Sequence, residues 1–532
     1  MPSAAADGFS SVEQVREAEA RLLRDRRLAN ELLDLMDATF TAHDNALRLA
    51  ATQACRSLFA TWAAAGEMRI GPRGEETQGE LASDVAFEAA AAAGDSVESR
   101  RAQALKAYRE WLEEKYKRFV SLLCEQLCNS DALPALRLLA LDSLMLLAAA
   151  EVRYARPGRG LYHAALGATS GALAQLLGRV VSSGSSLPAT VLHRFRDAHA
   201  QKLDVAYYLM RHVKCLAKPN SEKAASSPAR AERLLELMML VTPPASDVAP
   251  AEAQFLVSPR DDAGSEPEQW STTARSLLQR QRHQKEFCDA WRALLKLPLP
   301  GRAYRRVLIT LPEGILPYVP KPLRFCDLLS DGYSRGGLEA LLSLKGLFVL
   351  MHKHNLEYPQ FYRQLYTLVR PSALCGAYRE RFALELDLFL SSSGLPAYVS
   401  AAFAKRLGRL ALGVPPNGAA LACGIVYNLL LRQQPVRLLV HKAADGGVAA
   451  FPIGADSFVE DEDDPRLTGA LDSCLWEIDT LRHHYCPTVS SIAKMFAKPF
   501  SQTTRKVELQ PLAALSADSL MKVELNRRLK RA

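Results

Sequence analysis

Apolar residues recur along much of the chain at the three- and four-residue spacing of one helix face. The first such segment runs from about Ser11 to Met36, and comparable segments cover residues 104–128 and 133–152. Others begin near residues 161, 189 and 231. This periodicity predicts amphipathic helices, each with an apolar stripe that packs on a neighbour.

Proline and glycine divide the C-terminal half into shorter predicted helices. These cover residues 338–353, a segment after Pro359, a segment after Pro371 that ends at the turn 391–394, and residues 395–412, 421–431 and 467–483. Helical hairpins begin at intervals of roughly 40 residues, the period of HEAT-like repeats that stack helix pairs. No repeat of individual residues accompanies this period.

Two stretches have the composition of loose insertions. Residues 66–101 combine Gly, Ala and acidic residues, and residues 218–281 contain clusters of Pro, Ser, Ala and Asp. We predict mobile insertions near 66–101 and 218–281. The chain then divides into an N-terminal helical array over residues 1–300, a C-terminal helical repeat domain over 301–500, and a basic tail over 501–532.

Composition agrees with stacked helices. Of the 532 residues 48% are hydrophobic but only 7% aromatic, and Ala and Leu dominate. We therefore predict an all-α fold, a HEAT-like helical repeat solenoid with long disordered insertions. The ten cysteines follow no recognisable secretory signal, so we expect free thiols in a reducing compartment. The apolar window 133–152 contains Arg137, Asp142 and Glu151, which favours a core helix over a membrane span.

The sequence offers no candidate for catalysis, a metal site or a cofactor. It contains no nucleophile elbow, no phosphate-binding Gly-rich loop and no dinucleotide fingerprint. His352 and His354 have no further ligand at suitable spacing, although a zinc site needs three or four. The acidic run 460–464 lacks the ligand offsets of a calcium loop, so a solvated loop is favoured there. We predict that the chain is not an enzyme.

Two basic features are candidates for contact with RNA or with a partner. The net charge is only +8, so the placement of the basic residues matters more than their number. In the predicted helix 395–412, Lys405, Arg406 and Arg409 lie opposite apolar residues, and a solvated face is favoured over a phosphate-binding one. The tail ends in Arg527, Arg528, Lys530 and Arg531. It fits a partner-binding helix, an RNA-contacting arm or a nuclear-import signal equally well.

An ordered series of motifs in the C-terminal half is specific enough to compare with a known family. It includes the runs 346–362, 386–392, 395–398, 402–407, 427–430, 464–465, 470–477 and 484–485. Their order and spacing resemble the CBF domain of the nucleolar complex protein 4 family over about residues 331–500. Two positions depart from the family pattern. Asp456-Ser457-Phe458 stands where Asp-Pro-Phe is usual, and Gln434 stands where the family has His.

The resemblance implies a nucleolar ribosome biogenesis factor with a HEAT-like repeat fold and no catalytic residues. It implies a role in the small-subunit processome, pairing with nucleolar protein 14 in the maturation and export of small-subunit precursors. The motif aromatics Phe361, Tyr398, Trp476 and Tyr485 are candidates for a partner surface, although most such residues pack between helices. The alternative is a module that binds pre-ribosomal RNA directly through the basic tail. No membrane or small-molecule substrate is implied.

Overall fold

Helices account for every regular element that the structure describes. The computed structural model describes the chain apart from residues 1–8, 10, 26–27, 43, 69–96, 130, 156–160, 184–186, 219–226, 264–266, 393, 441–455, 502–503 and 527–532. Two compact units are present: unit 1 comprises Met1–Tyr304 and Gly314–Pro320, and unit 2 comprises Arg305–Glu313 and Lys321–Ala532. The predicted all-α, solenoid-like fold is confirmed for the described residues.

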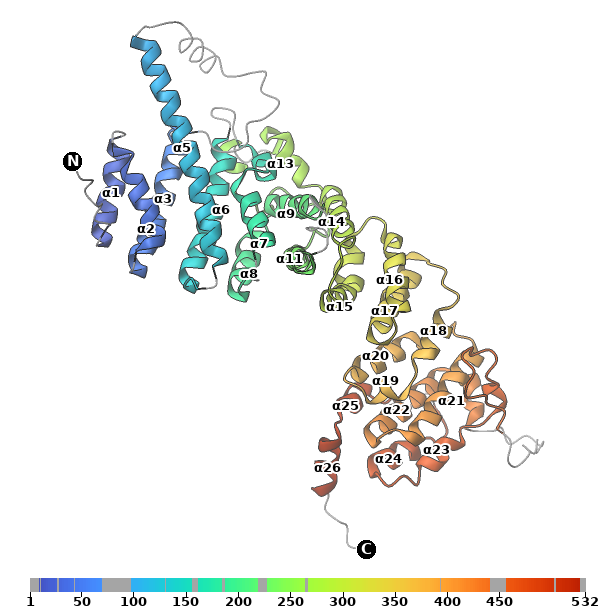
Figure 1. The fold of residues 1–532 in the computed structure, drawn as a ribbon. Helices are drawn as coiled ribbons and strands as arrows, with labels where there is room; N and C mark the ends of the chain where they lie inside the picture. Colours follow the sequence, from blue (N-terminus) through green and yellow to red (C-terminus); the bar gives the residue numbers. More distant parts are fainter. Residues whose placement is uncertain are drawn as a thin grey trace. The chain divides into compact units, whose positions relative to one another are not determined.

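Unit 1 is a succession of helices in which neighbours along the chain pack on one another (Figure 1). The α-helices are α1 (Val12–Arg24), α2 (Glu31–Thr41), α3 (Asn45–Ala64), α5 (Val97–Cys128), α6 (Pro134–Tyr154), α7 (Ala172–Ser182), α8 (Ala189–Phe195), α9 (Leu203–Leu216), α11 (Pro228–Met238), α12 (Arg260–Ala263), α13 (Thr272–Leu277) and α14 (Arg280–Leu294). Short 3-10 or π turns are η2 (His163–Gly167), η3 (Arg196–Ala200), η4 (Pro267–Gln269) and η6 (Leu316–Tyr318). α15 (Gly301–Thr310) and η5 (Leu311–Ile315) contain unit boundaries.

The predicted first helix, from about Ser11 to Met36, is divided into α1 and α2. Asp25 ends α1 in an extended conformation, with φ −132° and ψ 113°. Charged residues occupy positions 24–27, where a continuous helix would need apolar residues to sustain its buried stripe. The chain therefore turns, and both helices pack on α3.

One described stretch, His163–Ser182, is long and apolar enough to resemble a membrane span. In the structure it is divided between η2 and α7, and α7 has only 11 residues. Its apolar side chains, among them Leu173, Leu177 and Val181, are buried against α5, α6 and α9. A span needs about 20 residues, so α7 is a core helix of unit 1.

The second predicted insertion differs most from the structure. Residues 218–281 include α11, which agrees with the periodic segment predicted from near residue 231, and also α13. α11 buries one face against α7, α9 and α14. Asp204 fixes the segment that follows, because its carboxylate accepts hydrogen bonds from the Leu256 N–H at 2.9 and 3.0 Å. Phe255 and Trp270 are buried in a cluster with Leu203. Pro and Ser content suggested mobility, but these apolar residues supply a core. The other predicted insertion, 66–101, lies mostly outside the described residues; its last five residues begin α5.

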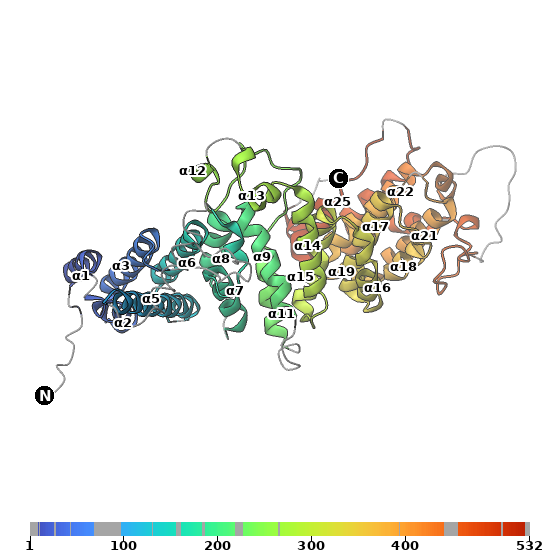
Figure 2. The same cartoon turned by 90° about the horizontal axis from the view of Figure 1, so that it is seen from above.

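Unit 2 is built around α22 (Pro416–Arg432), a helix that is almost wholly buried. Its elements are η7 (Pro322–Phe325), α16 (Cys326–Ser334), α17 (Gly337–His354), α18 (Phe361–Leu368), α19 (Pro371–Cys375), α20 (Arg379–Phe389), α21 (Ala397–Gly413), α22 (Pro416–Arg432), η8 (Gln434–Leu439), η9 (Ala470–Asp472), α23 (Trp476–Leu481), α24 (Pro487–Met495), α25 (Leu509–Ala514) and α26 (Ala517–Leu525). α22 packs against α19, α20, α21, α24 and α25, as Figure 1 shows. Figure 2 shows α19, α21, α22 and α25 from above. A helix that is apolar all round is expected to be central.

Two predictions for the C-terminal part of the chain need correction. The predicted helix 467–483 exists only as η9 and α23, because residues 473–475 form an irregular link held by polar contacts described below. The predicted tail begins with residues that belong to unit 2. Arg379 donates hydrogen bonds to the carbonyl oxygens of Ala513 and Leu515, both at 2.8 Å, and Asn428 pairs with the backbone of Val507.

Candidate functional site: a buried ion network

A lysine in the interior of unit 2 organises the candidate site. Lys405 lies on α21, on the same face as the small buried residues Ala401, Ala402 and Gly408. Small residues allow neighbouring segments to approach this face closely. The Lys405 side chain is fully buried, which is rare for lysine and costs free energy unless the ammonium group is paired.

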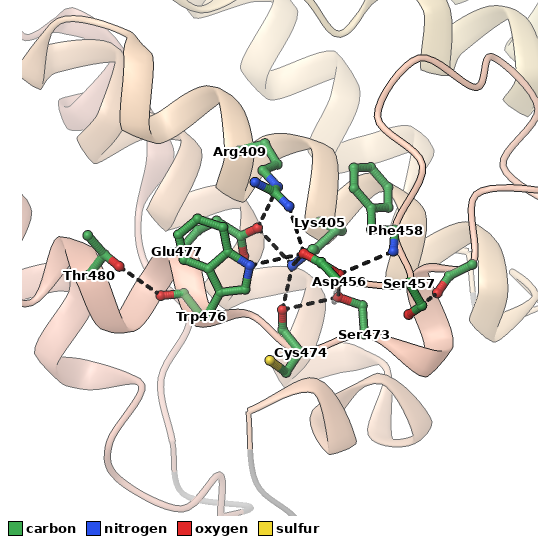
Figure 3. Close-up of polar contacts among 11 residues, drawn as sticks. Lys405, Arg409, Asp456, Ser457, Phe458, Ser473, Cys474, Trp476, Glu477 and Thr480 are labelled. Atoms are coloured by element: carbon green, nitrogen blue, oxygen red, sulfur yellow. Dashed lines mark hydrogen bonds and ion pairs between the residues drawn. The ribbon is translucent and has the colours of Figure 1, made fainter. Parts of the chain in front are cut away.

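Three oxygens surround the ammonium group of Lys405 (Figure 3). Its Nζ lies 2.8 Å from Asp456 Oδ2 and 2.7 Å from Glu477 Oε1, and it donates a hydrogen bond of 2.6 Å to the carbonyl oxygen of Cys474. An ammonium group carries three protons, so each can meet one oxygen. The two carboxylates thus compensate the charge of the buried ammonium group, and the carbonyl oxygen accepts its remaining hydrogen bond.

Arg409 adds a second cation one helical turn after Lys405. Its Nη2 donates to Asp456 Oδ2 at 2.7 Å, and its Nε lies 2.9 Å from Glu477 Oε1. The guanidinium carbon lies 4.7 Å from the centre of the Trp476 ring, in cation–π geometry. Two cations therefore face two carboxylates, and the group is electrically balanced when all four are ionised.

Asp456 joins the network to the loop that follows it. Its Oδ1 accepts from Ser473 Oγ at 2.5 Å and from the Phe458 N–H at 3.1 Å, and its Oδ2 accepts from Trp476 Nε1 at 3.0 Å. Burial alone would raise the pKa of Asp456, but these contacts and Lys405 outweigh burial and hold the pKa well below its usual range. Asp456 is therefore a carboxylate throughout the physiological range.

Glu477 is the more deeply buried carboxylate of the pair. Its side chain has no exposed surface. Burial raises the pKa of Glu477, while the contacts with Lys405 and Arg409 and a backbone hydrogen bond oppose this rise. Glu477 depends on both cations for its charge, because no water replaces them.

Backbone contacts fold residues 456–476 into one compact loop. The Val459 N–H donates to the Thr468 carbonyl oxygen at 2.9 Å, and the Leu475 N–H donates to the Leu439 carbonyl oxygen at 2.9 Å. Gly469 has φ +66°, and a Cβ there would lie 2.5 Å from the Ser457 carbonyl oxygen, so this turn requires glycine. The ion network anchors this loop to α21.

The comparisons with known proteins fit this region and extend well beyond it. The CBF/Mak21 family matches residues 340–493, which include the whole network. A zebrafish nucleolar complex protein 4 homolog is 30% identical over 508 residues, covering 95% of this chain and 89% of the relative. The human homolog is 31% identical over 519 residues, covering 96% of this chain and 91% of the relative. The chain belongs to the nucleolar complex protein 4 family.

A shorter match to the same family is stronger in identity. The mouse nucleolar complex protein 4 homolog is 42% identical over 247 residues, 46% of each chain. In that comparison the chain spans about half the length of the relative. The resemblance inferred from the motifs is confirmed, and two of those motifs, 402–407 and 470–477, supply Lys405 and Glu477 to the network.

The basic residues predicted on α21 turn inward. Lys405 is not on a solvated face, and Arg409 is paired as described, so their predicted exposure is wrong. Arg406 lies over the ring of Tyr366, with 4.4 Å from the guanidinium carbon to the ring centre, and its Nε donates to the Val369 carbonyl oxygen at 3.1 Å. The helical period placed these residues opposite an apolar face, but α21 is covered on both faces. Arg527, Arg528, Lys530 and Arg531 lie outside the described residues.

The candidate partner-binding aromatics fall into different environments. Phe361 is fully buried against Phe348 and Phe389, so it is a core residue and not a surface contact. Tyr398 is half-buried, and Trp476 is 39% exposed although its indole closes the ion network. Tyr485 is 81% exposed and stacks on His484. The structure therefore leaves three of the four as surface candidates.

Sequence reasoning missed the carboxylates of the site. In the sequence, Asp456 lies beside a departure from the family pattern and Glu477 lies within a motif, and neither pattern marks the residue as part of a site. One available signal was the set of small residues at three- and four-residue spacings around Lys405, which indicates a packed face. Among the described residues no group of three or more His, Cys, Asp or Glu is placed to hold a metal ion.

Proposed function

We propose that this chain is a non-catalytic ribosome biogenesis factor of the nucleolus. It acts in the small-subunit processome by holding nucleolar protein 14, and so serves the maturation and export of small-subunit precursors. The observation that carries the proposal is the match to the zebrafish and human nucleolar complex protein 4 homologs over 89% and 91% of their lengths. Both relatives are named for a nucleolar complex.

The architecture supports a role in holding other macromolecules. A solenoid-like stack offers a long, semi-rigid surface on which an extended partner segment makes many modest contacts. In unit 2 the charged groups of the ion network are paired with one another and do not need a partner. We therefore propose that the network contributes by fixing the conformation of the loop at the surface. Tyr398, Trp476 and Tyr485 are proposed contacts, because Tyr and Trp are enriched where partners bind.

The test is recovery of nucleolar protein 14 on the immobilised full chain, with and without nuclease. The full chain is needed because unit 2 includes Arg305–Glu313, a segment that lies between two parts of unit 1 in the sequence. This segment is tied to the rest of unit 2 by the ion pairs Arg305–Glu339, at 3.1 Å, and Glu313–Lys345, at 3.0 Å. Nuclease-resistant recovery is expected. Recovery that disappears with nuclease would contradict a protein scaffold and indicate that RNA holds the pair together.

One observation favours direct contact with pre-ribosomal RNA as a second candidate function. In unit 1 a groove of about 500 Å³ is lined by Lys218, Arg292 and Lys296, all exposed. Phosphate contacts of this kind give affinity that falls steeply with salt. The double variant Arg292→Gln, Lys296→Gln should weaken RNA binding, and its matched control Arg275→Gln, Lys285→Gln should not. Equal RNA affinities of the double variant and its control would show that the groove does not bind RNA. The basic residues of the tail, 527–531, would then be tested.

A further inference from the structure

The loop anchored by the ion network exposes several large apolar side chains. Leu467 is 67% exposed, Val459 51%, Leu471 46% and Trp476 39%. All four belong to residues 456–479, which we name the acidic loop. Single exposed apolar residues are ordinary on protein surfaces, but several on one short segment indicate an interaction site.

The acidic loop is held in one conformation by contacts beneath these side chains. Val459 and Thr468 are joined through their backbones at 2.9 Å, and Trp476 is fixed through Asp456 at 3.0 Å. The fully buried Lys405 ties both ends of the loop to α21. A surface that is already ordered loses little conformational entropy on binding.

The charge around the apolar side chains defines the partner. Outside the buried network the acidic loop contains seven acidic residues and one basic residue: Glu460, Asp461, Glu462, Asp463, Asp464, Asp472, Asp479 and Arg466. Asp463 has only a distant cation, Arg406 Nη1 at 4.0 Å, whereas Asp479 at the end of the loop is paired with Arg482 Nη1 at 2.8 Å. This excess of negative charge repels phosphate backbones and attracts lysine- and arginine-rich segments.

We propose that the acidic loop binds a basic segment of a protein partner, in which Lys or Arg residues alternate with apolar residues. The apolar side chains of the partner cover Leu467, Val459 and Leu471, and its cations meet the surrounding carboxylates. This inference rests on the proposal that the chain holds protein partners, and it adds the location and chemistry of one binding surface. The chain's own basic end and a second copy of the chain are the competing occupants.

The test measures binding of a short fluorescein-labelled peptide of alternating Lys and Leu to the full chain by fluorescence anisotropy. The variant Leu467→Ser and the triple variant Glu460→Gln, Asp461→Asn, Asp463→Asn should each weaken binding by about tenfold, the effect of losing one well-placed contact. The triple variant should also reduce the dependence on salt. The matched control Glu17→Gln, Glu252→Gln, Glu268→Gln removes three exposed carboxylates from unit 1 and should bind as the wild type does.

Four outcomes would overturn the inference. The first is wild-type affinity in the triple variant, and the second is equal affinity for a peptide in which Ser replaces Leu. A rise in affinity on deletion of residues 527–532 would mean that the chain's own end occupies the loop. A dimer seen by sedimentation that dissociates in the triple variant would mean that a second copy does.

Parallel recovery of nucleolar protein 14 separates this inference from the proposed function. If the wild type recovers nucleolar protein 14 but shows no preference for the Lys–Leu peptide, only the assignment of the acidic loop is wrong. If the wild type fails to recover nucleolar protein 14 under any nuclease condition, the scaffold proposal itself is contradicted, whatever the peptide does.

Discussion

Lys405 Nζ and Glu477 Oε1 lie 2.7 Å apart, and both side chains are fully buried. The two residues come from α21 and α23, so one ion pair joins helices that are distant in sequence. A buried pair of this kind contributes less through its own attraction than through the cost of breaking it. Removing either partner leaves the other charge in a site that water does not reach.

Replacing Lys405 by Met should destabilise unit 2 strongly. Met fills a similar volume, but it leaves Glu477 and Asp456 with only Arg409 as a close cation. We expect a loss of about 3–5 kcal/mol in the free energy of unfolding, as for other broken buried pairs. Chemical denaturation followed by circular dichroism measures it.

The control for this variant is Lys494→Met, which removes an exposed lysine of α24 and should change stability by less than about 0.5 kcal/mol. The double variant Lys405→Met, Glu477→Gln should lose less than the sum of the single losses, because the uncompensated carboxylate is gone. Additive losses would show that the pair is not coupled.

Replacing Asp456 by Asn should loosen the acidic loop without unfolding unit 2. The amide cannot accept from Ser473, Trp476 and Arg409 as a carboxylate does, and a local loss of about 1–2 kcal/mol corresponds to a 5- to 30-fold rise in the open population. Trypsin cleavage after the exposed Arg466 measures this opening. Asp472→Asn, on the same loop, is the control and should leave cleavage unchanged.

The effect of Asp456→Asn should be constant near neutral pH and should diminish only in acid. The folded-state pKa of Asp456 lies below its ordinary value, so its stabilising contribution is complete above that ordinary value and is lost as the pH falls through the folded pKa. The ratio of cleavage rates between variant and wild type should be the same at about pH 6 as at about pH 8. A difference that disappears within this range would contradict the depressed pKa.

The helices were predictable where one face alone is buried, as in α5, because an amphipathic period records which side packs. Helical periodicity does not predict which side chains are buried where both faces of a helix are covered. On α21 the same pattern marked Lys405 as solvated, since its buried counterions Asp456 and Glu477 come from a loop and a helix far along the chain. Residues 218–281 looked loose because no local pattern reveals that Asp204 binds the Leu256 N–H. Such long-range polar contacts leave no signal in one sequence.

Glu151 should make the stability of unit 1 depend on pH. Its carboxylate accepts from the Tyr116 hydroxyl at 2.8 Å and from the Ala172 N–H at the start of α7, at 3.0 and 3.1 Å. Burial raises the pKa of Glu151 to about 7 from the ordinary 4.5, against the effect of these hydrogen bonds. The folded state therefore keeps a proton that the unfolded state releases, and stability falls as the pH rises between these two values.

The variant Glu151→Gln tests this dependence, because Gln keeps the acceptor oxygen but does not titrate. Relative to the variant, the wild type should lose about 3 kcal/mol between about pH 4.5 and pH 7, the equivalent of its pKa shift. Denaturation curves across this range measure the difference. Glu114→Gln, whose carboxylate is 72% exposed, should show no such trend. A constant difference between Glu151→Gln and wild type would mean that Glu151 is ionised throughout.

Gly424 should be the position where a single methyl group disturbs the docking of α25. A Cβ at Gly424 on α22 would lie 2.9 Å from Leu512 Cδ1 and 3.1 Å from Leu509 Cδ2. Because the interior is close-packed, Gly424→Ala should cost about 1–3 kcal/mol through displacement of these leucines. Hydrogen exchange at residues 507–515 should then be faster.

The control is Gly413→Ala at the end of α21, where an added Cβ would meet nothing within 4 Å. Alanine loses less backbone entropy than glycine on helix formation, so this variant should be neutral or more stable by up to about 1 kcal/mol. Stability changes of opposite sign at these two helical glycines would show that the loss at Gly424 comes from packing against α25 and not from helix propensity. Equal stabilisation at both positions would mean that α25 moves away freely, and that the hydrogen bonds of Arg379 to Ala513 and Leu515 do not fix its position.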